Sequence, residues 1–295
     1  MSEPLKHHHL PIFYLSAWTD ADGELCEFKR PYRAVVVKRT TPAATGYRME
    51  LYSMPGLRPE HAQWIEKKVM GAIDHEAAKV HQHLLAVAKG APSQTFDGRQ
   101  RLYWARFLYA LIFRTPEHVA ELQSRYQAFV PKEIERYRAR YDSLRGPNDP
   151  ATFDEFRTRF LSNPRNMSGL NVVPHLANSE RVIGHIARMQ FRMITMRQFA
   201  GRGFLTSDRP IIMTNGLTLP HAHIVLPISP DALFIADKND AAYGYLSSLS
   251  PAELARQVNE KVAEQSHHFV YASDKSQFDF VAKRLGRKEK ATPLG

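Results

Sequence analysis

The residues of this chain that could do chemistry are acids, histidines and arginines scattered along its length. The sequence contains no G-x-S-x-G, H-E-x-x-H or C-x-x-C pattern and no EF-hand loop. The first candidate is Glu66, which a helical wheel places in the middle of an apolar stripe through residues 60–89. A carboxylate in such a stripe must be paired, bound to a metal or kept neutral.

Two further polar residues, Asp74 and His81, fall at the edge of the same stripe. The apolar segment 101–113 predicts a buried helix, and Arg114 follows it directly. Arg114 is the expected partner of Glu66 if the acid is structural. The alternative is that Glu66 acts as a metal ligand or a general base.

A basic line is expected on a long helix over residues 178–200. On that helix Arg181, His185, Arg188 and Arg192 would share one face, with no acid between Arg181 and Arg202. Like charges on one face repel each other, so an anionic partner would relieve the strain. Phosphate binding and a face paired with carboxylates from elsewhere in the fold are both consistent with this pattern.

Two short segments place polar side chains at the start or end of strands. In "FLTSDRPI", Asp208 follows a strand and precedes a proline, so it either organises the corner by accepting backbone N–H bonds or points into a cleft. In "HHHLPIFYL", three histidines run into an apolar, strand-like segment. A purification tag usually has six consecutive histidines and a linker, so these three are interpreted as part of the fold.

The order of the elements predicts an α+β fold in a single domain over residues 1–285. Residues 1–58 read as β-rich, 59–200 as helical and 201–285 as mixed, with a flexible basic tail over 286–295. Alternation of strand and helix is absent, and no glycine-rich loop follows a strand. This argues against a dinucleotide-binding or P-loop enzyme.

Composition favours an anionic partner in a reducing compartment. Lys and Arg number 40 against 30 Asp and Glu, a formal net charge of +10, and Cys26 is the only cysteine. No apolar run reaches the length of a membrane span, and no secretory signal pattern is present. A cytoplasmic protein that binds nucleic acid and no membrane is expected, although a basic solvated face alone would give the same charge.

The ordered set of motifs resembles the mainly bacterial family known as domain of unknown function 4238. "HHHLPIFYLSAW" is similar to its H-x-x-P opening, "WIEKKVMGAIDHEAA" to its Ile-Glu segment, and "FLYALIFRTP" to its Arg-Thr-Pro stretch. "FLTSDRPI", "LPISPDAL" and "VNEKVAEQSHHFVYAS" are similar to its later elements. The resemblance implies a polar set without a settled activity: His8, Glu66, Asp74, Arg114, Ser207, Asp208 and Asn259.

Three functions are consistent with these residues. The first is a metal-dependent nuclease or phosphodiesterase using Mg²⁺ or Mn²⁺, because carboxylates and an imidazole suit divalent metals that activate water. Its expected ligands are Glu66, Asp208 and Asp74, with His8 as ligand or base and Arg114 or Arg188 stabilising charge. The second is a non-catalytic module for nucleic acid or protein, in which the polar cluster is structural. The third is a toxin-like effector acting on a small phosphorylated ligand. A homo-oligomer is compatible with all three.

Overall fold

The computed structural model describes residues 5–92, 96–196, 199, 201–214 and 216–287. Arg197 and most of the basic tail expected over 286–295 lie outside these residues. The chain forms two compact units, each assembled from separate segments. The first unit contains residues 1–7, 48–72 and 116–178, and the second contains 8–47, 73–115 and 179–295. A single domain over 1–285 stays a prediction.

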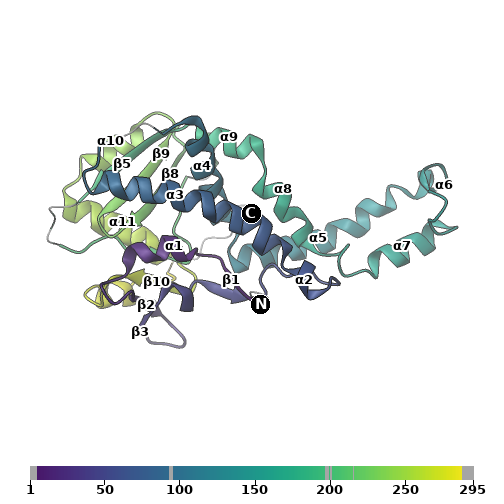
Figure 1. The fold of residues 1–295 in the computed structure, drawn as a ribbon, viewed down its shortest axis with the longest axis horizontal. Helices are drawn as coiled ribbons and strands as arrows, with labels where there is room; N and C mark the ends of the chain where they lie inside the picture. The colour runs from purple at the N-terminus through teal and green to yellow at the C-terminus, as the bar shows by residue number, and fades with distance from the viewer. Residues whose placement is uncertain (1–4, 93–95, 197–198, 200, 215, 288–295) are drawn as a thin grey trace. The chain divides into compact units, whose positions relative to one another are not determined.

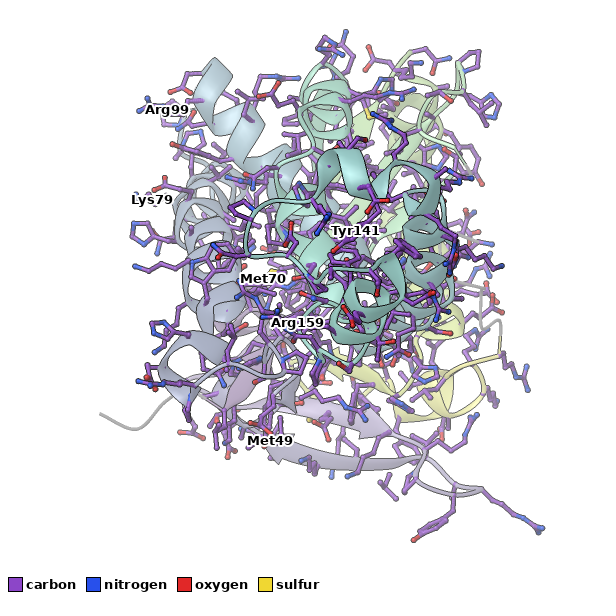
Figure 2. The ribbon with its side chains drawn as sticks, turned by 90° about the vertical axis from the view of Figure 1, so that its right-hand side faces the viewer. Met49, Met70, Lys79, Arg99, Tyr141 and Arg159 are labelled. Carbon is purple, nitrogen blue, oxygen red and sulfur yellow. The ribbon has the colours of Figure 1, made fainter. Side chains whose placement is uncertain are left out.

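The first unit is mainly helical, and Figure 1 shows α2 in blue and α5, α6, α7 and α8 in teal. Its elements are α2 (Pro59–Ala62), η3 (Ile65–Met70), α5 (Pro116–Glu135), η4 (Arg138–Arg140), α6 (Tyr141–Leu144), α7 (Phe153–Leu161), η5 (Gly169–Val172) and α8 (Val173–Ala177). A small apolar cluster joins α5, α6 and α7 through Val130, Ile134, Tyr141 and Phe153. Tyr141, labelled in Figure 2, donates from its hydroxyl to the Pro150 carbonyl at 2.8 Å.

The second unit holds the long strands of the described chain. Its elements are α1 (Ile12–Leu15), η1 (Ser16–Trp18), β2 (Leu25–Lys29), β3 (Val36–Thr40), η2 (Pro42–Ala44), α4 (Gly98–Phe113), α9 (Glu180–Ala187), β5 (Gln190–Thr195), β6 (Thr206–Ser207), β7 (Ile212–Met213), β8 (His223–Ser229), β9 (Ala232–Asp237), α10 (Ala241–Ser247), α11 (Pro251–Gln265), β10 (Phe269–Ala272) and α12 (Phe278–Ala282). Three elements contain residues of both units: β1 (Lys6–His8), β4 (Tyr47–Met49) and α3 (Gly71–Ala88). These elements confirm the α+β class.

Two four-stranded sheets, ordered β3-β2-β10-β6 and β5-β9-β8-β7, organise the second unit, and the pairings described within them are antiparallel. Strand β9 is buried along its whole length because both of its faces are covered. Phe234 packs edge-on against Trp104 of α4, while Leu233 and Ile235 join the core cluster that includes Val258 of α11. The same cluster includes residues of β2 and β10, so α11 packs against both sheets.

The predicted β-rich start is only partly correct, because residues 12–18 are helical. Tyr14 and Trp18 are four residues apart, which places them on one face of a helical turn. The Tyr14 hydroxyl donates to the Pro227 carbonyl at 2.8 Å, and the Trp18 indole N–H donates to the Phe204 carbonyl at 2.8 Å. A short apolar run in the sequence does not by itself distinguish a helix from a strand. The hydrogen bonds of Tyr14 and Trp18 stabilise the helical conformation.

Candidate functional site

Arg114 forms an ion pair in which the cation is fully buried. Its side chain is 0% exposed, whereas that of Asp74 is 23% exposed. Nη1 donates to Asp74 Oδ1 at 2.7 Å and Nη2 donates to Asp74 Oδ2 at 2.9 Å, a bidentate geometry. Nη2 also donates to the His8 carbonyl at 2.7 Å. Asp74 is therefore a carboxylate partner of Arg114. The pairing of Glu66 with Arg114 that the sequence favoured stays a prediction.

Glu66 lies in the first unit, in a π-helical segment that spans Ile65–Met70. Its side chain is half-buried, with Oε2 shielded from solvent, and Val69, Met70 and Ile73 of the predicted stripe are buried. The helical wheel assumed an α-helix throughout residues 60–89. A π turn contains one extra residue, so the side chains that precede it point in directions other than those the wheel assigns relative to α3. The other acids of the predicted set, Asp74 and Asp208, belong to the second unit.

Asp208 organises the corner between α11 and β10. Its Oδ1 accepts from the backbone N–H of His267 at 2.9 Å, and its Oδ2 accepts from those of His268 at 2.6 Å and Phe269 at 3.0 Å. The side chain is 6% exposed. Of the two roles open to Asp208 from the sequence, these contacts match the corner-forming one.

Ser207 and Asn259 are both buried and both bond to nearby backbone. Ser207 Oγ accepts from the Arg209 N–H at 3.2 Å. Asn259 Oδ1 accepts from the Leu205 N–H at 2.8 Å, and its Nδ2 donates to the Gly203 carbonyl at 2.9 Å. Asn259 thereby ties α11 to the segment that leads into β6.

His7 and His8 belong to β1, and His9 follows the end of this strand. His7 and His9 are buried, while His8 is half-buried with its ring 5.5 Å from that of Tyr47. His7 Nδ1 accepts from the Tyr52 N–H at 2.8 Å, and the two rings are stacked. The three histidines are thus part of the fold, at the end of a strand. The segment after it is helical rather than the strand expected from its apolar composition.

The long helix predicted over residues 178–200 is wrong. Helix α9 ends at Ala187, Arg188 caps it, and β5 follows as an edge strand paired with β9 from Gln190 to Thr195. The backbone hydrogen bonds to β9 outweigh the helical pattern of the side chains. Arg192 therefore lies on a strand and not on the basic face of the predicted helix. Its Nη2 donates to Asp240 Oδ2 at 3.1 Å. His185 Nε2 donates to the Leu217 carbonyl at 2.6 Å.

Arg181 and Arg188 stay together on the exposed face of α9. Within the described part of the chain, neither guanidinium contacts a carboxylate. The first turn of α4 lies beside the end of α9, because Arg101 Nε donates to the Ala187 carbonyl at 2.9 Å. Arg99, on that turn, is exposed and labelled in Figure 2. Lys79, also labelled there, differs in having a carboxylate partner, Glu76, at 3.0 Å.

A polar cavity of about 670 Å³ lies in the second unit, bordered by α3, η1 and the turn between β8 and β9. His81, Lys89, Ser229 and Asp231 are among its lining residues. His81 Nε2 donates to the Ile228 carbonyl at 2.8 Å, and its ring stacks on that of Trp104. Burial lowers the pKa of His81 to about 4, so the imidazole is neutral at pH 7. Sequence patterning placed His81 beside an apolar stripe but did not reveal the cavity.

We expect His81 to make folding pH-dependent. The unfolded chain binds a proton to His81 near its ordinary pKa of 6.5, whereas the folded chain does so only near 4. Stability is therefore complete above about pH 6.5 and falls as the pH drops toward 4, by about 3 kcal/mol at most from this residue. Urea unfolding at several pH values should show a smaller loss for His81→Gln than for the wild type. Parallel pH curves would contradict this assignment.

The fold and these contacts define an α+β protein in which most of the predicted polar residues bond to buried backbone or to each other. The family model described as "Protein of unknown function (DUF4238)" matches residues 6–276, nearly the whole chain. The chain therefore belongs to this family. Comparison with curated proteins and with solved structures found no match. Among the described residues, the helices are too short or too polar to cross a bilayer.

Proposed function

We propose that this protein binds nucleic acid, without cleaving it, through a basic face formed by Arg181 of α9 and Arg188 at the C-cap of that helix. The observation that carries the proposal is that these exposed guanidinium groups contact no carboxylate within the described chain. A formal net charge of +10 would draw a polyanion toward this face. Arg192 is not part of the face, because it is paired with Asp240.

The geometry of the basic face suits a repeated phosphate ligand. Arg181 and Arg188 are seven residues apart, or about 10 Å along the helix axis, and point to the same side. Arg101 holds the end of α9 against α4 and places its guanidinium 4.1 Å from the centre of the Phe191 ring. Because α9 is held against α4, the basic face should lose little conformational entropy when a ligand binds.

Two of the three acids expected as metal ligands, Asp74 and Asp208, fit a structural role better than a catalytic one. Both oxygens of Asp74 accept from Arg114, and both oxygens of Asp208 accept from backbone N–H groups. A guanidinium against Asp74 would also repel a divalent cation. These two residues do not fit Mg²⁺ or Mn²⁺, so binding is proposed in preference to metal-dependent hydrolysis.

The test is a salt titration with a matched charge control. Labelled single-stranded RNA and double-stranded DNA are titrated by fluorescence anisotropy at several salt concentrations. Arg181→Ala/Arg188→Ala should weaken binding and reduce the magnitude of the log–log salt slope by about 2, because two phosphate contacts are lost. Arg136→Ala/Arg145→Ala removes the same charge from arginines paired with Glu133 and Asp142 and should leave the slope unchanged.

Two results would contradict nucleic-acid binding at this face. One is wild-type affinity that does not fall as salt is added, since phosphate contacts release counterions. The other is an equal loss in both double variants, which would indicate a response to net charge alone.

A further inference from the structure

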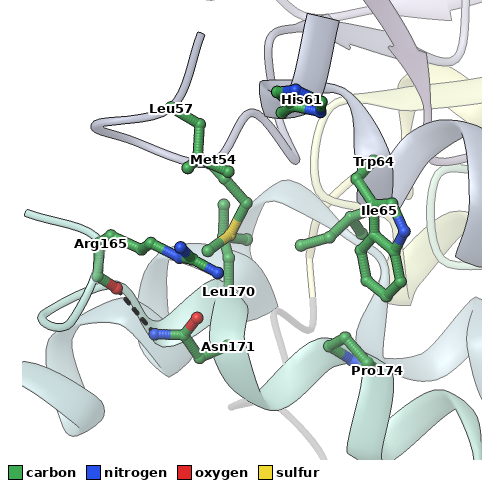
Figure 3. Close-up of a pocket in the computed structure, with 9 residues that line it drawn as sticks. All are labelled: Met54, Leu57, His61, Trp64, Ile65, Arg165, Leu170, Asn171 and Pro174. Atoms are coloured by element: carbon green, nitrogen blue, oxygen red, sulfur yellow. Dashed lines mark hydrogen bonds between the residues drawn. The ribbon is translucent and has the colours of Figure 1, made fainter.

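The first unit contains a cavity of about 510 Å³ with an apolar floor and polar groups at its border (Figure 3). Ile65 and Leu170 are 1% and 6% exposed and belong to the floor. Met54, Leu57 and Pro174 add further apolar surface, while His61, Trp64, Arg165 and Asn171 supply the polar atoms. This size falls within the usual range for small-molecule sites.

The backbone around the cavity is held by specific contacts. The Met54 N–H donates to the Ala62 carbonyl at 2.9 Å, which fastens the loop before α2 to the end of that helix. Gly56 turns this loop with a φ of 75°, a conformation that favours glycine. Asn171 Nδ2 donates to the Arg165 carbonyl at 2.8 Å, a bond drawn in Figure 3, and so fixes the backbone that carries the guanidinium.

Trp64 and Arg165 lie at opposite sides of this cavity (Figure 3). The Trp64 side chain is left 48% exposed, an unusual state for a large aromatic beside a buried apolar floor. The Arg165 guanidinium reaches toward Met54 and Leu170, and within the described residues it has no acceptor. The lining contains no carboxylate, so the site is complementary to negative charge.

We propose that this cavity binds a small aromatic anion, with its ring on Trp64, its apolar body over Ile65 and Leu170, and its anionic group on Arg165. An indole face stacks well on another aromatic ring. A guanidinium recognises carboxylate or phosphate oxygens through paired N–H donors. The proposal goes beyond nucleic-acid binding and is independent of it, because the basic face of α9 belongs to the other unit.

Tryptophan emission gives a direct readout, since the chain has three tryptophans and two of them, Trp18 and Trp104, are 0% exposed. We would titrate the whole protein with 3-phenylpropionate by calorimetry and by emission excited at the red edge. Saturable one-to-one binding that changes the Trp64 emission is expected. The uncharged amide, 3-phenylpropionamide, should bind at least about tenfold more weakly, because a charge-assisted hydrogen bond is lost.

Three variants separate the contacts. Arg165→Gln should remove the preference for the acid over the amide, and Trp64→Leu should weaken binding and remove the emission change. Arg159→Gln, on α7 and labelled in Figure 2, changes an exposed arginine of the same unit outside the cavity and should behave as wild type. Any of three results would overturn the proposal: the acid and the amide bind equally well, Arg165→Gln binds the acid with wild-type affinity, or the protein does not bind the acid at all.

Discussion

Replacing Asp74 with alanine is expected to lower the free energy of unfolding by about 3–5 kcal/mol, because the partner left behind is a buried charge. Arg114 is 0% exposed and donates two of its described bonds to Asp74. Without the Asp74 carboxylate, the guanidinium loses two charge-assisted hydrogen bonds and retains the one to the His8 carbonyl at 2.7 Å. Desolvation of a cation is offset only by an opposite charge or by several good acceptors, and alanine supplies neither.

Equilibrium unfolding in urea measures this loss. The matched control is Glu133→Ala, which breaks an ion pair to Arg136 on the surface, where the Arg136 side chain is 75% exposed. That change should alter stability by less than about 1 kcal/mol. A loss of similar size in both variants would mean that the Arg114–Asp74 pair behaves as a surface pair, contrary to its burial.

Replacing Asp208 with asparagine is expected to cost about 2–4 kcal/mol, because three backbone N–H groups lose a charged acceptor. The amide keeps one oxygen, and its NH₂ group would face N–H donors of residues 267–269. Asp279→Asn is the control, since it removes the same charge from an exposed carboxylate in the first turn of α12. Its effect should stay below about 1 kcal/mol.

The same Asp208 variant separates binding from catalysis. Wild-type protein is incubated with single- and double-stranded DNA and RNA in Mg²⁺, Mn²⁺ or EDTA, and the length of the nucleic acid is followed. Non-catalytic binding requires that the length stays constant under every condition. Metal-dependent cleavage that disappears in Asp208→Asn while stability remains that of the wild type would instead establish Asp208 as a catalytic residue.

Local signals in the sequence were sufficient for several elements. Ser250 and Pro251 are residue types that favour the start of a helix, and in the structure Ser250 Oγ accepts from the Glu253 N–H at 3.3 Å at the start of α11. The apolar segment 101–113 predicted a buried helix, which α4 confirms over most of its length. These features depend on residues close together in the chain, so a linear pattern contains them.

Contacts between residues far apart in the chain explain why two predicted elements were wrong. Residues 190–195 join a sheet because β9, some forty residues later, offers a row of backbone partners. Residues 12–18 form helical turns because Tyr14 and Trp18 bond to carbonyls of Pro227 and Phe204. Neither partner is adjacent in the sequence, so periodicity alone assigned the wrong element in both places.

By itself, the sequence determined the class of fold, the basic charge, the family and the polar residues from which a site would be built. Tertiary structure decided what each polar residue contacts. Arg114 meets Asp74 because α3 and α4 bring together residues 40 apart in the chain. Asp208 meets the backbone of residues 267–269, which are 59 to 61 positions further along. A charged residue in an apolar segment of the sequence indicates that a partner is needed, because a buried charge is costly without one. Packing of the elements selects the partner, because hydrogen bonds form only between groups that the fold brings within about 3 Å.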